Sequence, residues 1–123
     1  MRGNNTYRDL IVWQKSMDLV EEVYRITRLL PDEENYVLAS QMRRSVISIP
    51  SNIAEGQSRK GDKEFSNFLS FAIGSKSELE TQLLICLKLG YFSEKEIEKS
   101  MSLCDEISKM IYALTDRLEK IKE

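Results

Sequence analysis

Apolar residues recur at spacings of three and four in four segments of the chain, each long enough for several helical turns. The first segment, about 9–30, contains one series at Trp13, Met17, Val20, Tyr24 and Thr27 and a second at Val12, Leu19, Val23, Ile26 and Leu30. Such spacing places each series on one face of a helix. Two adjoining series indicate either a wide buried face or a surface that meets another subunit, and Pro31 predicts the end of the helix.

The second segment, about 36–57, keeps its apolar spacing on both sides of Pro50. A proline inside a helix removes one backbone hydrogen bond and crowds the preceding turn, so a kink is expected. Because the apolar phase continues past the proline, we expect one kinked helix rather than two short helices that break at Ile49. The Gly-Gln-Ser-Arg-Lys-Gly run at 56–61 is the clearest loop of the chain.

The third segment begins after this loop, with Asp62 as the expected N-cap, and reaches about Leu89. Its apolar stripe comprises Phe65, Phe68, Leu69, Ala72, Leu79, Leu83 and Cys86. Small residues follow another side of the helix, at Ser66, Ser70, Gly74, Ser77 and Thr81. Small side chains let a second helix approach closely, so we interpret Gly74 as a packing site rather than a hinge.

The fourth segment follows Gly90, which is expected to end the third helix in the left-handed conformation, and the capping-box pattern Ser93–Glu96. Its apolar positions are Ile97, Met101, Cys104, Ile107, Ile111, Leu114, Leu118 and Ile121. Four such helices with short connections predict an all-α protein, an antiparallel up-down-up-down four-helix bundle with a proline-kinked second helix. Residues 1–8 are then a flexible N-terminal arm and 9–123 a single bundle domain.

Composition agrees with long helices, since the 123 residues include only 5 glycines and 2 prolines. The net charge of −2 argues against a grip on nucleic acid by the whole molecule. The polar start lacks a signal peptide and no apolar run could span a membrane, so we expect a cytoplasmic protein. Cys86 and Cys104 occupy apolar positions, and we interpret them as reduced core thiols rather than a disulfide or reactive pair.

The chain contains no histidine, which removes the usual general base, a common zinc ligand and every Ser-His or Cys-His nucleophilic pair. Two cysteines cannot complete a structural zinc site, and no phosphate-binding glycine loop is present. We therefore expect a non-enzymatic protein with no metal, no cofactor and no small-molecule substrate.

The most basic part of the chain is 35–61, with four cations (Arg43, Arg44, Arg59 and Lys60) against Glu55. Guanidinium groups present paired donors to phosphate oxygens. The candidate nucleic-acid-binding residues are Arg43, Arg44, Ser48, Asn52, Arg59 and Lys60. The alternative is a solvated face with one or two intramolecular salt bridges. Copies that converge in a symmetric oligomer would add their fields despite the negative net charge.

The run at 40–56 (SQMRRSVISIPSNIAEG) resembles the four-helix bundle proteins encoded within intervening sequences of bacterial 23S ribosomal RNA genes. Further matching segments are 10–15 (LIVWQK), 65–69 (FSNFL), 74–83 (GSKSELETQL) and 89–91 (LGY). The resemblance covers nearly the whole chain and implies a bundle that assembles into a ring, typically a homopentamer. A related branch includes the accessory variability protein of diversity-generating retroelements, a basic barrel that partners a reverse transcriptase and nucleic acid, whereas this chain is acidic.

The same resemblance assigns residues of this sequence to the family pattern. Arg43, Arg44 and Arg59 match positions that are commonly basic in such proteins, and the signature residues are Pro50, Asn52, Glu55 and Gly56. Two functions follow as hypotheses. One is a homo-oligomer with an RNA or nucleoprotein partner. The other is a protein-interaction scaffold with no nucleic-acid role, indicated by the negative net charge and the second apolar series of 9–30.

Overall fold

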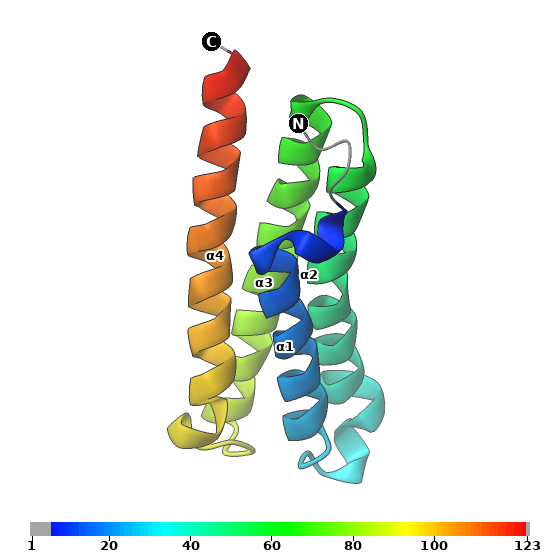
Figure 1. The fold of residues 1–123 in the computed structure, drawn as a ribbon. Helices are drawn as coiled ribbons and strands as arrows, with labels where there is room; N and C mark the ends of the chain where they lie inside the picture. Colours follow the sequence, from blue (N-terminus) through cyan, green and yellow to red (C-terminus); the bar gives the residue numbers. More distant parts are fainter. Residues whose placement is uncertain (1–5, 123) are drawn as a thin grey trace.

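The computed structural model describes the backbone of residues 6–122 and the side chains of residues 6–120. These residues form four α-helices and no strand: α1 (Ile11–Thr27), α2 (Ser40–Ser58), α3 (Asp62–Lys88) and α4 (Glu94–Lys122). The predicted all-α class is therefore confirmed. The connections lie alternately at the two ends of the molecule (Figure 1), an arrangement compatible with the predicted up-down-up-down order. None of the helices in this described part is long and apolar enough to cross a membrane.

A short 3-10 helix, η1 (Tyr7–Asp9), precedes α1. Thr6 starts it with a capping box, in which the Arg8 amide donates to Thr6 Oγ1 and the Thr6 amide donates to Asp9 Oδ2, both at 3.2 Å. Regular structure therefore begins before residue 9, the boundary expected between arm and domain. Residues 1–5 of that arm lie outside the described residues.

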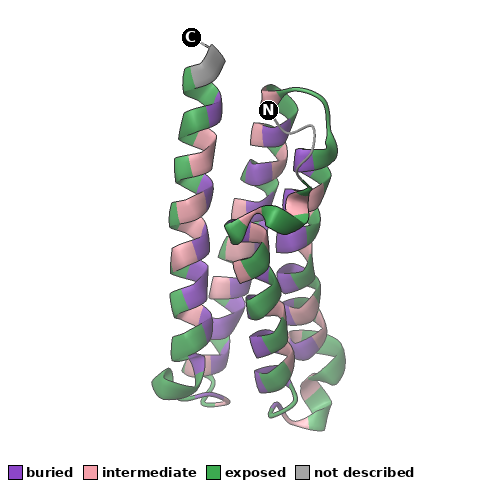
Figure 2. Cartoon of the chain, viewed as in Figure 1, coloured by how far each residue is buried: buried purple, intermediate pink, exposed green. Residues whose placement is uncertain are grey.

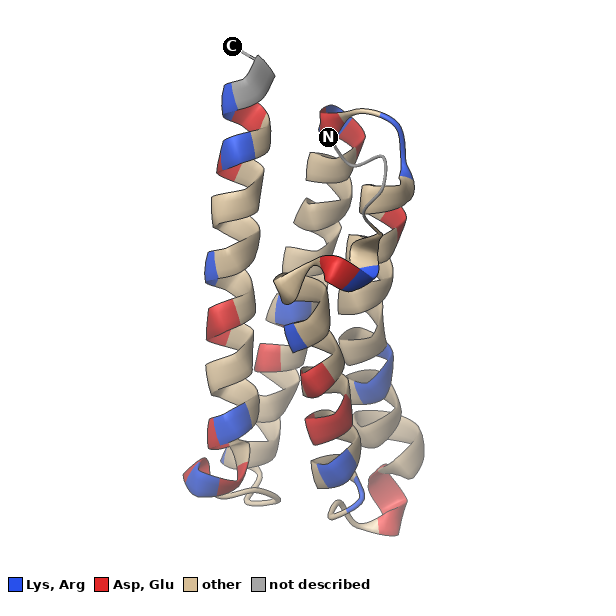
Figure 3. Ribbon diagram, viewed as in Figure 1, with Lys and Arg blue, Asp and Glu red and all other residues tan. Residues whose placement is uncertain are grey.

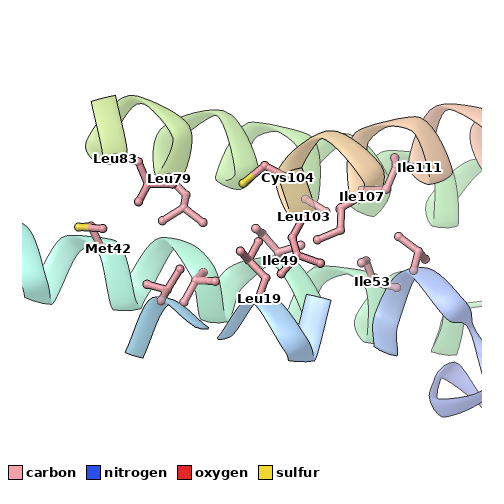
Figure 4. Packing of buried hydrophobic residues seen from close by; sticks show 14 of the residues in the cluster. Leu19, Met42, Ile49, Ile53, Leu79, Leu83, Leu103, Cys104, Ile107 and Ile111 are labelled. Atoms are coloured by element: carbon pink, nitrogen blue, oxygen red, sulfur yellow. The ribbon is translucent and has the colours of Figure 1, made fainter. Parts of the chain in front are cut away.

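The hydrophobic core runs along the centre of the bundle, where side chains of all four helices point toward one another (Figure 4). On α1 the buried apolar residues belong to the series Val12, Leu19, Val23 and Ile26, with Leu30 just beyond the helix. The neighbouring series is only partly covered from Trp13 to Tyr24, where Met17 is 42% exposed, and it is fully buried at Thr27. Figure 2 shows the same division along each helix, with buried positions facing the other helices. Each fully buried aliphatic side chain contributes about 1.5–3 kcal/mol to folding.

α2 continues through Pro50 as one helix, which confirms the preference for one helix over two; the kink itself stays a prediction. The loop predicted at 56–61 is wrong at its start, because α2 extends to Ser58. The reason lies at Gly56. A Cβ atom there would lie 2.6 Å from Phe68 Cβ, so glycine is needed for the close approach of α3 and not for a turn.

The chain reverses at Gly61, where a φ of 92° falls in the region that favours glycine. α3 therefore starts at Asp62, and Gly61 occupies the N-cap position that the sequence predicts for Asp62. The packing interpretation of Gly74 is also wrong within this chain, since a Cβ atom there would meet nothing within 4 Å. The strip of small residues on α3 faces outward at Gly74. The close contact between two helices is instead between α2 and α3 at Gly56.

The α3–α4 connection follows the prediction. Gly90 has a φ of 81°, and the Tyr91 amide donates to the Cys86 carbonyl at 2.9 Å, closing the end of α3. The capping box is also confirmed: the Glu96 amide donates to Ser93 Oγ at 3.2 Å and the Ser93 amide to Glu96 Oε1 at 2.8 Å. The side chain of Ile121, predicted to end the apolar seam of α4, lies outside the described residues.

Both cysteines are free and fully buried, as predicted for reduced core thiols. Burial raises the pKa of the Cys86 thiol to about 11 and that of Cys104 to about 12. Both groups therefore stay protonated at neutral pH, and a protonated thiol is a poor nucleophile. Cys86 Sγ lies 3.8 Å from Met42 Sδ across the α2–α3 interface.

Candidate nucleic-acid interface

The six candidate binding residues lie along α2 and its exit and do not converge on one point. From Arg44 to Arg59 the helix rises about 22 Å at 1.5 Å per residue. Arg43 and Arg44, although adjacent in sequence, project about 100° apart around the helix axis. Their surroundings differ accordingly.

Arg43 is turned toward α1 and is half-buried. Its Nε donates a hydrogen bond to Thr27 Oγ1 at 3.0 Å, and its guanidinium carbon lies 5.2 Å from the centre of the Tyr24 ring. The Thr27 hydroxyl is fully buried and donates to the Tyr24 carbonyl at 3.2 Å. Arg43 therefore ties α2 to α1 through a cation–π contact and a charged hydrogen bond.

Arg44 is exposed and turned toward α3. It lines a groove of about 400 Å³ together with Gln41, Ser45, Ser48 and Glu78. The Arg44 side chain forms no hydrogen bond or ion pair within residues 6–120. Its guanidinium is therefore open to a ligand, with the Glu78 carboxylate as the acidic residue of the same groove.

Ser48 bonds α2 to α3, and Asn52 bonds to Ser48 from the next turn of α2. The hydroxyl oxygens of Ser48 and Ser75 are 2.7 Å apart, and Asn52 Nδ2 donates to the carbonyl and the hydroxyl of Ser48 at 2.8 and 2.9 Å. The Ser48 hydroxyl and the Asn52 amide are thus engaged inside the protein. Ser48 links α2 to α3, whereas the hydrogen bonds of Asn52 stay within α2.

Arg59 and Lys60 lie at the exit of α2. Arg59 Nε contacts Glu55 Oε2 at 2.7 Å, and its guanidinium carbon lies 5.2 Å from the centre of the Phe68 ring. Lys60 is exposed, and its side chain makes no hydrogen bond or ion pair in the described part of the chain. Both interpretations of the basic segment therefore apply, residue by residue: Arg43 and Arg59 have intramolecular partners, whereas Arg44 and Lys60 are open cations.

Two stripes meet along this side of the molecule, and we call them together the α2–α3 face. On α2 the stripe comprises Arg44, Ser48, Glu55 and Arg59, and on α3 it comprises Phe68, Phe71, Ser75 and Glu78. The contacts Ser48–Ser75 and Arg59–Phe68 and the Arg44–Glu78 groove join them. The part of α3 that belongs to this face, residues 65–75, contains no charged residue, and Figure 3 shows this uncharged stretch of the helix.

The signature residues have structural surroundings. Pro50 is buried, Glu55 is ion-paired with Arg59, and Gly56 allows the close approach of Phe68. Gly74 borders a second groove of about 410 Å³ that shares Gln41 and Glu78 with the first.

Sequence reasoning missed two features. An open apolar groove of about 290 Å³ lies between α1 and α2, lined by Trp13, Met17, Ile47 and Pro50 among others. Its signal in the sequence was the second apolar series of 9–30, for which a surface that meets another subunit was one of the two interpretations. The second feature is Phe71, which is 57% exposed on α3. Its signal in the sequence was its absence from the apolar stripe predicted for the third segment.

A mixed-charge groove of about 760 Å³ lies beside α1 and is lined by residues that include Lys15, Glu22, Arg25 and Lys99. Glu22 is buried and accepts two hydrogen bonds from Arg25, at 2.9 and 2.7 Å. These bonds hold the pKa of Glu22 below its usual value. Within the described residues no group of three or more His, Cys, Asp or Glu side chains could hold a metal ion.

A family model and a solved structure each match most of the chain. A family model described as 23S rRNA-intervening sequence protein matches residues 8–113. The crystal structure of a protein with unknown function from the S23 ribosomal protein family of Bacteroides thetaiotaomicron superposes with a TM-score of 0.79 at 24% identity. The match covers 85% of this chain and 98% of that chain, and it shows a shared fold. No curated protein matches the sequence.

Proposed function

The chain belongs to the 23S rRNA-intervening sequence protein family, and from that premise we propose that it is a non-enzymatic homo-oligomer that associates with RNA through α2 and its exit. The observation that carries the proposal is the pair of open cations, Arg44 and Lys60, on an exposed side of an otherwise acidic chain. Cations without an intramolecular partner are free to replace the counterions of phosphate groups.

The non-enzymatic part of the proposal rests on the chemistry of the side chains. The chain has no histidine, and its two thiols are buried with raised pKa values. Neither a general base of the usual kind nor a thiolate nucleophile is thus available at neutral pH.

The oligomeric part rests on the apolar groove between α1 and α2. Met17 and Ile47 are 42% and 43% exposed there, side by side with Trp13 and Pro50. Adjoining exposed apolar side chains are typical of surfaces that another protein covers. We propose that a second copy covers this groove in a homopentamer, the ring size that the family resemblance implies. Copies around one axis would add the fields of Arg44 and Lys60.

A binding experiment with a charge-matched control tests the RNA association. Affinity for a structured RNA is measured by filter binding over a range of salt concentrations for the wild type and for Arg44→Ala with Lys60→Ala. Lys109 and Lys120 are exposed lysines on α4, so Lys109→Ala with Lys120→Ala makes the same change in net charge elsewhere. We expect the first double variant to lose about tenfold or more in affinity and to flatten the salt dependence by roughly two contacts. The control should bind almost as the wild type does.

Two results would contradict the proposal: no binding by the wild type at low salt, or equal losses in both double variants. The Glu78→Gln substitution adds a test of opposite sign. Removing the carboxylate beside Arg44 should raise RNA affinity by roughly two- to threefold, because one repulsive charge leaves the groove. Light scattering at micromolar concentration tests the assembly, and a monomer there would contradict it.

The apolar groove also favours a second function, a protein-interaction scaffold with no nucleic-acid role. That function predicts partner capture that survives the loss of Arg44 and Lys60 and is abolished by Met17→Glu. Met17 is exposed, so this substitution leaves the core intact.

A further inference from the structure

We infer that the α2–α3 face binds single-stranded nucleic acid and that Phe71 is the platform on which an unpaired base stacks. This inference rests on the proposed RNA association and names the class of strand that the same surface takes.

Phe71 is presented outward by a fixed neighbour. Its ring meets Phe68 edge to face, with centroids 5.5 Å apart and planes at 87°. Phe68 is in turn held from two sides: Gly56 lets α2 come close to its Cβ atom, and the Arg59 guanidinium covers its ring. Phe71 therefore rests on an anchored ring while 57% of it stays exposed.

The surroundings of Phe71 suit a charged strand better than an apolar partner. Arg59 lies beside its neighbour Phe68 at one end of the face, and Arg44 lies at the other, about 22 Å away along α2. That distance corresponds to about six nucleotides at ~3.4 Å per stacked nucleotide. Arg59 and Glu55 are paired with each other and add no net charge to the face, and residues 65–75 around Phe71 carry no charge. The open cations are Lys60, next to Arg59 in the sequence, and Arg44, whose groove also contains Glu78. One open cation thus lies at each end of a face with an exposed aromatic ring, a combination found in single-strand grooves.

An aromatic platform discriminates between strand types for a geometric reason. In a duplex the faces of the bases are covered by neighbouring pairs, so a protein ring on the outside contacts only backbone and groove edges. An unpaired base exposes its face and can stack on Phe71. Because every base has such a face, the expected preference is for single strands over duplexes, with little dependence on sequence.

The test compares an oligouridylate of about twelve nucleotides with an RNA duplex of equal length by fluorescence anisotropy. Phe71→Ala is the variant, and Tyr112→Ala, which removes another exposed aromatic ring on α4, is the matched control. We expect Phe71→Ala to weaken single-strand binding about five- to hundredfold, the range of one lost stacking contact. Duplex binding should change less than twofold, and Tyr112→Ala should change neither affinity.

A second variant tests the stacking contact at residue 71 by its own fluorescence. Phe71→Trp keeps an aromatic platform, so its affinity should stay near that of the wild type. Its added fluorescence should be quenched when oligouridylate binds, beyond any change of Trp13, the one tryptophan of the natural chain. If the added fluorescence of Phe71→Trp does not change when the oligonucleotide binds, the stacking contact is refuted.

The other outcomes separate the two proposals. If Phe71→Ala leaves single-strand binding intact, or weakens both ligands equally, stacking is refuted, while a loss in the Arg44/Lys60 double variant would still support RNA association. If Phe71→Ala instead lowers the mass in light scattering, the ring contacts a second copy and not a base. If the wild type binds neither ligand, both proposals fail.

Discussion

Arginine side chains on the two sides of α2 have different roles, one in packing and one open to a ligand. Toward α1, Arg43 is half-buried against Tyr24 and bonded to Thr27. Toward α3, Arg44 stands open beside Glu78, while the packing there depends on Gly56 and on the Ser48–Ser75 contact. A side chain's chemistry does not decide whether it stabilises the fold or faces a ligand. The neighbouring helix decides it.

Gly56 should show the largest effect on stability, and it tests the role of close packing on the α3 side of α2. We expect Gly56→Ala to lower the free energy of unfolding by about 2–3 kcal/mol, because the new methyl group would lie 2.6 Å from Phe68 Cβ. Urea unfolding followed by circular dichroism measures it. A neutral result would mean that α3 moves away from α2 without cost.

Arg43 should show the second-largest effect. Arg43→Ala removes a charged hydrogen bond and leaves the buried Thr27 hydroxyl oxygen without its donor, so we expect a loss of about 1–2 kcal/mol. A double-mutant cycle with Thr27→Val should return a coupling energy of at least about 0.5 kcal/mol. Additive effects would show that the contact contributes nothing of its own.

Gly74 should respond in the opposite direction. An exposed glycine inside a helix costs about 1 kcal/mol relative to alanine, and a Cβ atom here has open space. Gly74→Ala should therefore stabilise the monomer by up to that amount in thermal unfolding. If it destabilises the protein and also reduces the mass in light scattering, a second copy packs closely on this strip.

Arg44 should show the smallest effect on stability. Its side chain has no hydrogen bond or ion pair within residues 6–120, so Arg44→Ala should change the unfolding free energy by less than about 0.5 kcal/mol. The same substitution should weaken RNA binding. A variant that loses stability and binding together would make Arg44 a structural residue like Arg43.

Local patterns in the sequence predict the features that depend on one helix alone. The four helical segments, the capping box at Ser93 and the left-handed Gly90 all follow from spacing and residue type. The buried thiols follow from their apolar positions in the same way.

Features that depend on two helices could not be predicted in this way. The sequence predicts a loop at Gly56 and a close helix contact at Gly74, and only the position of Phe68 shows that the close contact is at Gly56. Likewise, Phe71 and Arg59 are twelve residues apart in the chain, and the turn at Gly61 brings their helices together. The candidate interface was therefore predictable as a set of residues on α2, but not as a face shared with α3.

The two buried thiols can report how often the helices around them open. Cys86 in α3 and Cys104 in α4 are fully covered and protonated in the folded state, so a thiol reagent can reach them only when the helices around them part. Under conditions where opening is in equilibrium, the labelling rate of each cysteine measures the free energy of local opening around it. RNA or a second copy that rigidifies the bundle would then be seen as slower labelling at one cysteine or both, without any engineered probe.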